Sequence, residues 1–194
     1  MPPAKIITVF GSSRPKEGDA DYAQARELGY ALAAKGFTVC SGGYGGVMEA
    51  VSRGAKDAGG QTLAVTARFF RAQANRWVDE EIRVDTWEQR LFELVRRGDG
   101  YVACKGGTGT LVELAVVLEM LNKGVMQGKP FVVLGDFWQP IIERVREVEA
   151  PGRPSSEVVD SPWREANVRL IHPVPTPAAA ADFLARRLPP TPQT

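Results

Sequence analysis

Short apolar segments rich in β-branched residues alternate along the chain with longer segments of helical periodicity. Four of the short segments are KIITVF (5–10), FTVC (37–40), QTLAVTA (61–67) and KPFVVLG (129–135). Between the first two, apolar residues recur every three or four positions from Tyr22 to Ala33, which is the spacing of an amphipathic helix. Strands that are apolar on both faces are typical of a parallel sheet covered by helices on both sides. The sequence therefore predicts a doubly wound, Rossmann-like α/β fold of three layers with a mostly parallel sheet.

A chain of 194 residues is long enough for one domain with a substantial core. We expect that domain to span residues 1–188, with residues 189–194 as a flexible tail. Two segments interrupt the alternation of strands and helices. Residues 68–80 form an excursion that is either a lid over a binding cleft or a surface loop, and the Pro/Ser-rich residues 150–163 are expected to form a flexible loop.

The charge balance of the chain does not favour a polyanionic partner. Lys and Arg number 24 and Asp and Glu number 23, so the net charge is +1, and nothing favours nucleic acid or an anionic membrane as a partner. With two cysteines and one histidine, the chain offers neither a disulfide framework nor the spacing of a metal site. The first apolar stretch is too short to span a membrane and lacks the plan of a signal peptide, so we expect a cytoplasmic protein.

Three loops rich in glycine and hydroxyl-bearing residues follow predicted strands. They are GSSR (11–14), SGGYGG (41–46) and KGGTGT (105–110). Because the carboxyl ends of parallel strands share one edge of a sheet, we expect the three loops to meet there. Two of them lead directly into helices, whose unpaired N–H groups and positive dipole end favour a phosphate. Glycine also serves such turns for steric reasons alone, but three loops of this kind together predict a ligand that carries a phosphate.

Two charged residues are expected near the third loop. Glu113 lies in the helix that follows it, and helical side chains lean toward the N-terminus, so the carboxylate would point at the bound group. The pattern Thr110-x-x-Glu113 also fits a capping box, in which the glutamate only closes the first helical turn. Arg90, early in a helix that starts at the same edge of the sheet, can reach the cleft, although its position fits a solvated arginine equally well. Trp77 and Trp87 are expected to pack rather than to stack on a base.

Taken together, these motifs resemble a known family. GGTGTLVE (106–113) is similar to the signature P-G-G-x-G-T-x-x-E of the cytokinin-activating phosphoribohydrolases, often called the LOG family. VFGSSR (9–14) and SGGYGGVMEAV (41–51) resemble the first two loops of that family, and VDTWEQR (84–90) is similar to its D-T-M-H-E-R-K segment. Lys105 replaces the proline of the signature and Leu91 replaces the lysine after the arginine. These changes resemble a divergent branch related to the molybdenum-cofactor carriers and the DprA-like nucleotide binders.

The resemblance implies an enzyme that hydrolyses the N-glycosidic bond of a nucleoside 5′-monophosphate, and a homodimer or higher homo-oligomer. It places Arg90 and Glu113 at the catalytic positions. The residues that it implies for binding the phosphate or the nucleotide are Gly11, Ser12, Ser13, Gly42, Gly43, Gly46, Met48, Gly106, Gly107, Thr108, Gly109 and Thr110.

Neither a metal nor an organic cofactor is needed for this reaction. Relatives of the family also carry the label lysine decarboxylase, which has no support here, because pyridoxal chemistry needs a Schiff-base lysine and no pattern singles one out. The alternative function is a non-catalytic protein that binds or carries a nucleotide or the molybdenum cofactor, with Glu113 as a helix cap. An additional cation at Lys105 favours tight binding without helping bond cleavage.

Overall fold

The computed structural model of the chain describes residues 4–126, 128–149 and 170–188. The tail predicted at 189–194 and the loop predicted at 150–163 lie outside the described residues. No helix within the described ranges is long and apolar enough to cross a membrane.

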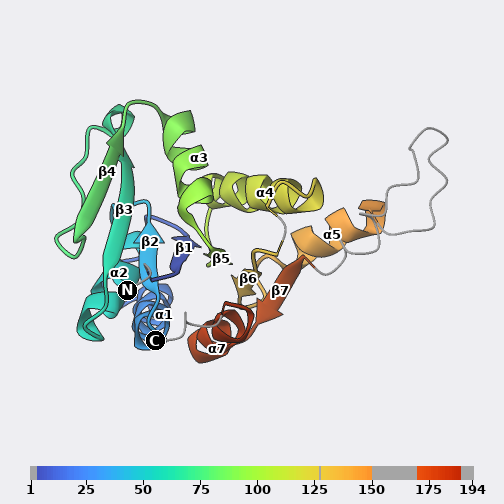
Figure 1. Ribbon diagram of the computed structural model, residues 1–194, viewed down its shortest axis with the longest axis horizontal. Helices are drawn as coiled ribbons and strands as arrows, with labels where there is room; N and C mark the ends of the chain where they lie inside the picture. The colour runs from blue at the N-terminus through green and yellow to red at the C-terminus, as the bar shows by residue number, and fades with distance from the viewer. Residues whose placement is uncertain (1–3, 127, 150–169, 189–194) are drawn as a thin grey trace.

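The described strands form one parallel sheet. They are β1 (Ile6–Phe10), β2 (Thr38–Ser41), β3 (Thr62–Ala67), β4 (Glu80–Val84), β5 (Gly100–Ala103), β6 (Phe131–Leu134) and β7 (Ile171–Val174). Their order in the seven-stranded sheet is β4-β3-β2-β1-β5-β6-β7, and every neighbouring pair is parallel. The doubly wound α/β fold predicted from the sequence is confirmed (Figure 1).

Helices cover both faces of this sheet. They are α1 (Ala20–Ala34), α2 (Val47–Asp57), α3 (Trp87–Arg97), α4 (Thr108–Asn122), α5 (Gln139–Glu149) and α7 (Pro177–Arg187), with a short 3₁₀ helix η1 (Arg68–Phe70) after β3. In Figure 1, α1, α2 and α7 lie below the sheet, and α3 and α4 lie above it. The result is the predicted three-layer arrangement, and the excursion at residues 68–80 contains η1 and the connection to β4.

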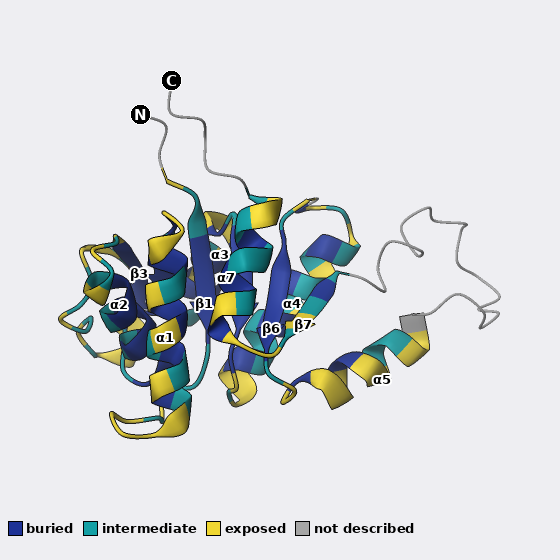
Figure 2. Ribbon diagram, turned by 90° about the horizontal axis from the view of Figure 1, so that it is seen from below, coloured by how far each residue is buried: buried dark blue, intermediate teal, exposed yellow. Residues whose placement is uncertain are grey.

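Residues of β1 contribute to a core on each face of the sheet. Ile7 and Val9 belong to a core shared with α1, α2 and α7, whereas Phe10 belongs to a second core shared with α3, α4 and α5. All three side chains are at most 2% exposed. Figure 2 shows the buried strands between helices whose exposed residues lie on their outer sides. Each core buries apolar surface between the sheet and the helices on one face. Because such burial stabilises the fold by roughly 25 cal/mol per square ångström, the two cores hold the three layers together.

The winding of the sheet reverses between β1 and β5. The chain adds β2, β3 and β4 outward on one side of β1, and then returns to place β5 on the other side. The loop after β1 leads to α1 on one face, and the loop after β5 leads to α4 on the opposite face. Because these two connections diverge, a crevice opens between them, and α/β proteins of this kind bind ligands at this position.

Candidate functional site

A cleft of about 1250 Å³ lies at the carboxyl edge of the sheet. Its walls come from the loops after β1 and β5, the first turns of α3 and α4, and residues near η1. Eleven of the residues assigned to the site from the sequence line it: Gly11, Ser12, Ser13, Met48, Arg90, Gly106, Gly107, Thr108, Gly109, Thr110 and Glu113. The topology of the sheet thus brings together segments that are far apart in the sequence.

The N-terminus of α4 opens onto this cleft. The helix begins at Thr108, with Gly107 as its N-cap and no side chain that caps it. Its first N–H groups therefore lack helical partners and carry the positive end of the helix dipole. A Cβ on Gly107 or Gly109 would meet no heavy atom within 4 Å, so the space beside these backbone positions is free. The capping box considered for Thr110 and Glu113 is not formed, because Thr110 is the third residue of the helix, and the open amides suit an anion instead.

Two basic side chains stand beside this helix start. The Lys105 ammonium is 3.0 Å from a carboxylate oxygen of Asp21 on α1, so part of its charge is already neutralised. Arg14 is exposed on the wall of the cleft, and within the described ranges it forms no ion pair. The Arg14 backbone N–H donates a hydrogen bond of 3.1 Å to the Ser12 hydroxyl, which fixes the turn that carries it. Arg14 is therefore the rim cation that is available to a charged ligand.

Arg90 is buried in the first turn of α3 and lines the cleft. Its Nε–H donates to the carbonyl oxygen of Val65 at 2.9 Å, and Nη2 contacts the sulfur of Met48 at 3.7 Å. The guanidinium carbon lies 5.3 Å from the ring centroid of Tyr44 and 5.5 Å from that of Phe70, the distances of cation–π contacts. The interpretation of Arg90 as a solvated surface residue is therefore wrong.

The glycines of the second loop (41–46) pack against residues of the cleft wall. Gly42, Gly43 and Gly46, which the resemblance assigned to ligand binding, do not line the cleft. A Cβ on Gly42 would overlap Nη2 of Arg90, so the missing side chain makes room for the guanidinium. Gly46 has a φ of +68°, and a Cβ there would overlap the Ser12 carbonyl of the first loop. These glycines are needed for close packing between the loops and the arginine.

Glu113 and Arg90 form a loose ion pair inside the cleft. Oε1 lies 4.0 Å from Nη1, and the two side chains are 14% and 9% exposed, respectively. Burial raises the pKa of the Glu113 carboxyl group from its ordinary value of 4.5 to about 7, and the charge of Arg90 acts in the opposite direction. Burial also lowers the pKa of Arg90, against the effect of Glu113. A carboxyl group whose pKa is close to neutral can exchange a proton with a substrate or a water molecule at physiological pH.

Aromatic side chains form a further part of the wall that the sequence motifs do not predict. Tyr44, Phe70, Trp87 and Phe137 line the cleft, and the rings of Tyr44 and Phe70 lie 5.5 Å apart at 72°. Phe70 and Phe137 are 42% and 44% exposed. Trp87, expected only to pack, thus faces the cleft, whereas Trp77 does not line it. Two features of the sequence could have indicated this wall: the position of Tyr44 between glycines and the aromatic residues of the 68–80 segment. Exposed rings of this kind can stack on a flat heteroaromatic group.

The cysteines take no part in this site. Cys40 and Cys104 are both free and buried, as expected of small apolar residues. Burial raises the pKa of each thiol to about 12, so neither forms a reactive thiolate at neutral pH. Within the described part of the chain, no group of three or more His, Cys, Asp or Glu residues is placed to hold a metal ion.

Comparison with known proteins agrees with this architecture. An uncharacterised protein of Archaeoglobus fulgidus is 35% identical over 75% of this chain and 88% of its own length. A cytokinin riboside 5′-monophosphate phosphoribohydrolase of Rhodococcoides fascians is 29% identical over 78% of this chain and 79% of its own length. Among solved structures, the molybdenum-cofactor binding protein of Rippkaea orientalis superposes with a TM-score of 0.73 at 24% identity, covering 96% of this chain and 98% of that one. That likeness concerns the fold.

A family model extends the comparison over most of the chain. Residues 4–155 match the model of the SLOG cluster4 family. This range includes the three glycine loops, Arg90 and Glu113, so the resemblance carried by the sequence motifs is confirmed. The chain belongs to the SLOG cluster4 family.

Proposed function

We propose that the protein hydrolyses the N-glycosidic bond of a nucleoside 5′-monophosphate and releases the free base and ribose 5-phosphate. The observation that carries this proposal is the Arg90–Glu113 pair, buried in the same cleft onto which the uncapped N-terminus of α4 opens. The phosphate binds the amides that start at Gly107, with the hydroxyls of Ser12 and Ser13 beside it. Support also comes from the relative in Rhodococcoides fascians, whose name describes this reaction.

The chemistry follows from the charges in the cleft. When the bond between C1′ and the base nitrogen breaks, its electron pair leaves with the base and positive charge develops on the ribose. The Glu113 carboxylate stabilises this charge and accepts a proton from the water whose oxygen bonds to C1′, and a proton then passes from Glu113 to the base nitrogen, which restores the carboxylate and completes the neutral base. Arg90 holds the carboxylate and the sugar hydroxyls in place and offsets the repulsion between Glu113 and the phosphate. The aromatic wall contacts the base.

The main alternative is a protein that holds the same class of ligand without turnover. Lys105 was the sequence feature that favoured it, but the ion pair with Asp21 engages that charge. The two functions are separated by incubating the purified protein with AMP, GMP, CMP and UMP and measuring free base and ribose 5-phosphate by mass spectrometry. Release by the wild type that disappears in Arg90→Ala supports hydrolysis. Tight binding without release over many hours assigns the cleft to a carrier.

Gly109→Ala is expected to weaken substrate binding while stabilising the fold. The added methyl group projects into open space beside the amides of α4, where the phosphate oxygens would lie. We expect KM to rise roughly tenfold, equivalent to about 1.4 kcal/mol, with kcat close to that of the wild type. Because alanine is the better helix former, stability is expected to increase by about 0.5–1 kcal/mol. Steady-state kinetics and thermal unfolding test both effects, and an unchanged KM would place the phosphate elsewhere.

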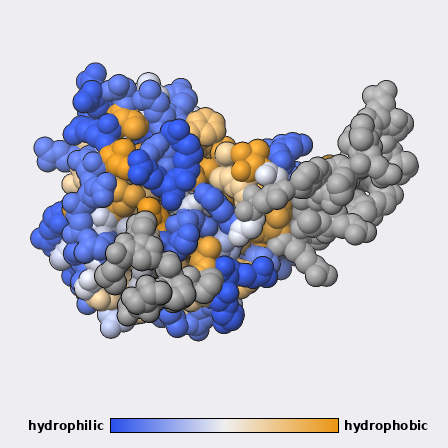
Figure 3. Space-filling view, in the orientation of Figure 1, coloured by the Kyte–Doolittle hydropathy of each residue, from blue (hydrophilic) through white to orange (hydrophobic). Residues whose placement is uncertain are grey.

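We also propose that the protein forms a homodimer through the outer face of α4. Its inner face buries Thr110, Leu114, Val117 and Leu121. Five further apolar residues of the helix are only half-buried, namely Leu111, Val112, Val116, Leu118 and Met120. Figure 3 shows apolar residues at the surface in the region of α4 and α5. A helix that is apolar around most of its circumference suits burial against a partner, and a second copy satisfies this by symmetry.

Ala115→Arg is expected to disrupt this dimer. Ala115 is exposed on the outer face of α4, so the fold of one protomer tolerates a larger side chain there. In a dimer the arginine would bring a charge into an apolar contact, and we expect the dissociation constant to rise at least about 100-fold. Light scattering after size-exclusion chromatography measures the mass of both forms. A wild-type protein that is monomeric at every concentration would contradict the proposed dimer.

A further inference from the structure

Asn75 lies outside the cleft, in the connection between η1 and β4, and joins this connection to the second glycine loop. Its Nδ2 group donates hydrogen bonds of 3.0 Å to the carbonyl oxygens of both Gly43 and Tyr44. Its backbone N–H donates a third bond, of 2.7 Å, to the Gly43 carbonyl. The amide oxygen accepts a bond of 3.0 Å from the N–H of Trp77. Both side-chain donor hydrogens and the acceptor oxygen of Asn75 are therefore engaged, and the turn at Gly43–Tyr44 is fixed from one side.

Tyr44 transmits this constraint to the site. Its hydroxyl group accepts a hydrogen bond of 2.9 Å from the N–H of Ala67 and donates one of 3.1 Å to the carbonyl of the same residue. Between its anchored backbone and its anchored hydroxyl, the ring faces the guanidinium of Arg90 with its centroid 5.3 Å from the guanidinium carbon. The ring of Phe70 completes the aromatic contact with the arginine at 5.5 Å. The position of the Arg90 charge thus depends on where Tyr44 is held.

We propose that Asn75 is a positioning residue for Arg90: by holding the Gly43–Tyr44 turn, it keeps the Tyr44 ring against the guanidinium and the guanidinium near Glu113. Because it concerns the same ion pair, this inference rests on the proposed function and deepens it. Asn75 itself does not line the cleft. Its effect on the reaction passes through Tyr44 and Arg90.

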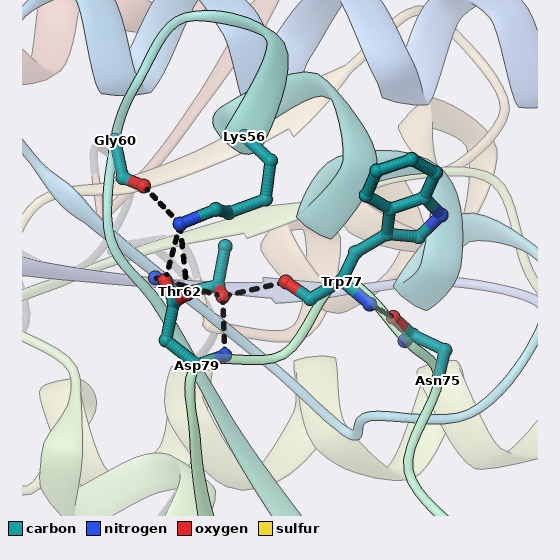
Figure 4. Close-up of polar contacts among 6 residues, drawn as sticks. All are labelled: Lys56, Gly60, Thr62, Asn75, Trp77 and Asp79. Carbon is teal, nitrogen blue, oxygen red and sulfur yellow. Dashed lines mark hydrogen bonds and ion pairs between the residues drawn. The ribbon is translucent and has the colours of Figure 1, made fainter.

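The connection that carries Asn75 is anchored a second time at its other end, as Figure 4 shows. Lys56 Nζ lies 2.7 Å from the carboxylate of Asp79, and the same carboxylate accepts a bond of 2.9 Å from the N–H of Thr62. Lys56 also donates to the carbonyl of Gly60 at 3.2 Å. None of these groups contacts Tyr44 or Arg90. A change at Lys56 therefore loosens the same connection without loosening the Tyr44 turn, which makes it a matched control.

The protonation of Glu113 reports the position of Arg90. The positive charge of Arg90 lowers the pKa of Glu113 against the effect of burial. The other charged groups of the cleft wall are Arg14, Asp19, Asp21 and Lys105. They come from the loop after β1, from the start of α1 and from the residue before the α4 loop, whereas the pKa of Glu113 is raised by burial and lowered by Arg90. If Arg90 moves away, the pKa of Glu113 must rise.

The experiment is a carbon-13 NMR titration of the Glu113 carboxyl group, assigned with Glu113→Gln, in four proteins. Asn75→Leu has nearly the same size as the wild type but no hydrogen bonds, and Tyr44→Phe removes only the hydroxyl anchor. We expect both to raise the pKa of Glu113 by roughly 1 unit and to lower kcat roughly tenfold at pH 7. Lys56→Met is expected to lower the melting temperature and leave the pKa of Glu113 unchanged.

The titration does not depend on turnover, so it separates this inference from the proposed function. If the pKa of Glu113 is raised in Asn75→Leu but no form of the protein hydrolyses a nucleotide, the positioning role is supported and the proposed hydrolysis is contradicted. If Asn75→Leu melts earlier and the pKa of Glu113 stays at the wild-type value, as in Lys56→Met, Asn75 is a structural residue only and the inference is overturned.

Discussion

Glu113→Gln is expected to lower turnover by about 10³-fold and, at the same time, to make folding stability less dependent on pH. A glutamine has the shape of a glutamate, but it accepts no proton from water and places no charge beside the developing positive charge of the ribose. A positioned acid–base group contributes about 10²- to 10⁴-fold to the rate, and we expect a loss within this range. The assay is the release of base from a nucleoside 5′-monophosphate at saturating concentration.

The effect on stability follows from the raised pKa of Glu113. The folded protein holds the proton up to about pH 7, whereas the unfolded chain releases it near 4.5. Between these values the folded state binds more protons, so the stability of the wild type falls as the pH rises through this window and stays low above it. The difference between the two pKa values corresponds to roughly 3 kcal/mol. Glutamine does not titrate, so the stability of the variant relative to the wild type is expected to increase by up to this amount between pH 5 and pH 8.

Glu119→Gln on the same helix is the matched control. Glu119 is exposed, pairs with Lys123 at 3.4 Å and accepts a hydrogen bond of 3.3 Å from Nδ2 of Asn122, and it lies outside the cleft. Its replacement is expected to change neither turnover nor the pH dependence of thermal unfolding. If the stability difference between Glu113→Gln and the wild type were constant from pH 5 to pH 8, the carboxyl group would not be protonated near neutrality. If Glu113→Gln retained full turnover, Glu113 would have no catalytic role.

The fold and the meeting of Arg90 with Glu113 could be predicted because they depend on local patterns and one rule of topology. Apolar strands that alternate with helices predict a parallel sheet, and loops after parallel strands converge at one edge. Both residues follow such loops by one or two helical turns. Their location in one cleft therefore needed no knowledge of the packing of individual side chains. The open helix start at Gly107 follows from the same pattern.

The separate roles of the glycines could not be predicted in this way. Gly42 and Gly109 are both loop or helix-start glycines in similar sequence surroundings, yet one packs against Arg90 and the other borders open space. The difference depends on which side chain a distant helix brings near, and periodicity contains no information about that contact. The roles of Tyr44 and Asn75 could not be predicted for a related reason. Their pairing joins a glycine loop to a segment without periodicity. The pKa of Glu113 depends on how deeply its carboxyl group is buried, which periodicity does not give either.

Gly42→Ala is expected to lower kcat by about 10²-fold, chiefly through its effect on Arg90. The φ of Gly42 is not positive, so the backbone accepts an alanine, but the new Cβ would overlap Nη2 of Arg90 and lie 2.7 Å from the sulfur of Met48. The guanidinium must therefore move away from its hydrogen bond with the Val65 carbonyl and from Glu113. Such crowding in a packed site costs about 1–3 kcal/mol of stability, and it leaves Glu113 without its counter-ion.

Gly109→Ala makes the same chemical change at the start of α4, and comparing the two variants separates an effect on bond breaking from an effect on binding. An alanine that displaces Arg90 acts on the bond-breaking step, so Gly42→Ala should lower kcat and raise the pH at which the rate reaches its maximum, because Glu113 holds its proton more tightly. An alanine beside the phosphate acts on binding, so Gly109→Ala should raise KM alone. Rate profiles from pH 5 to pH 9 for the two variants measure both quantities. A Gly42→Ala enzyme with wild-type kcat and an unshifted profile would show that turnover does not depend on the guanidinium position that Gly42 permits.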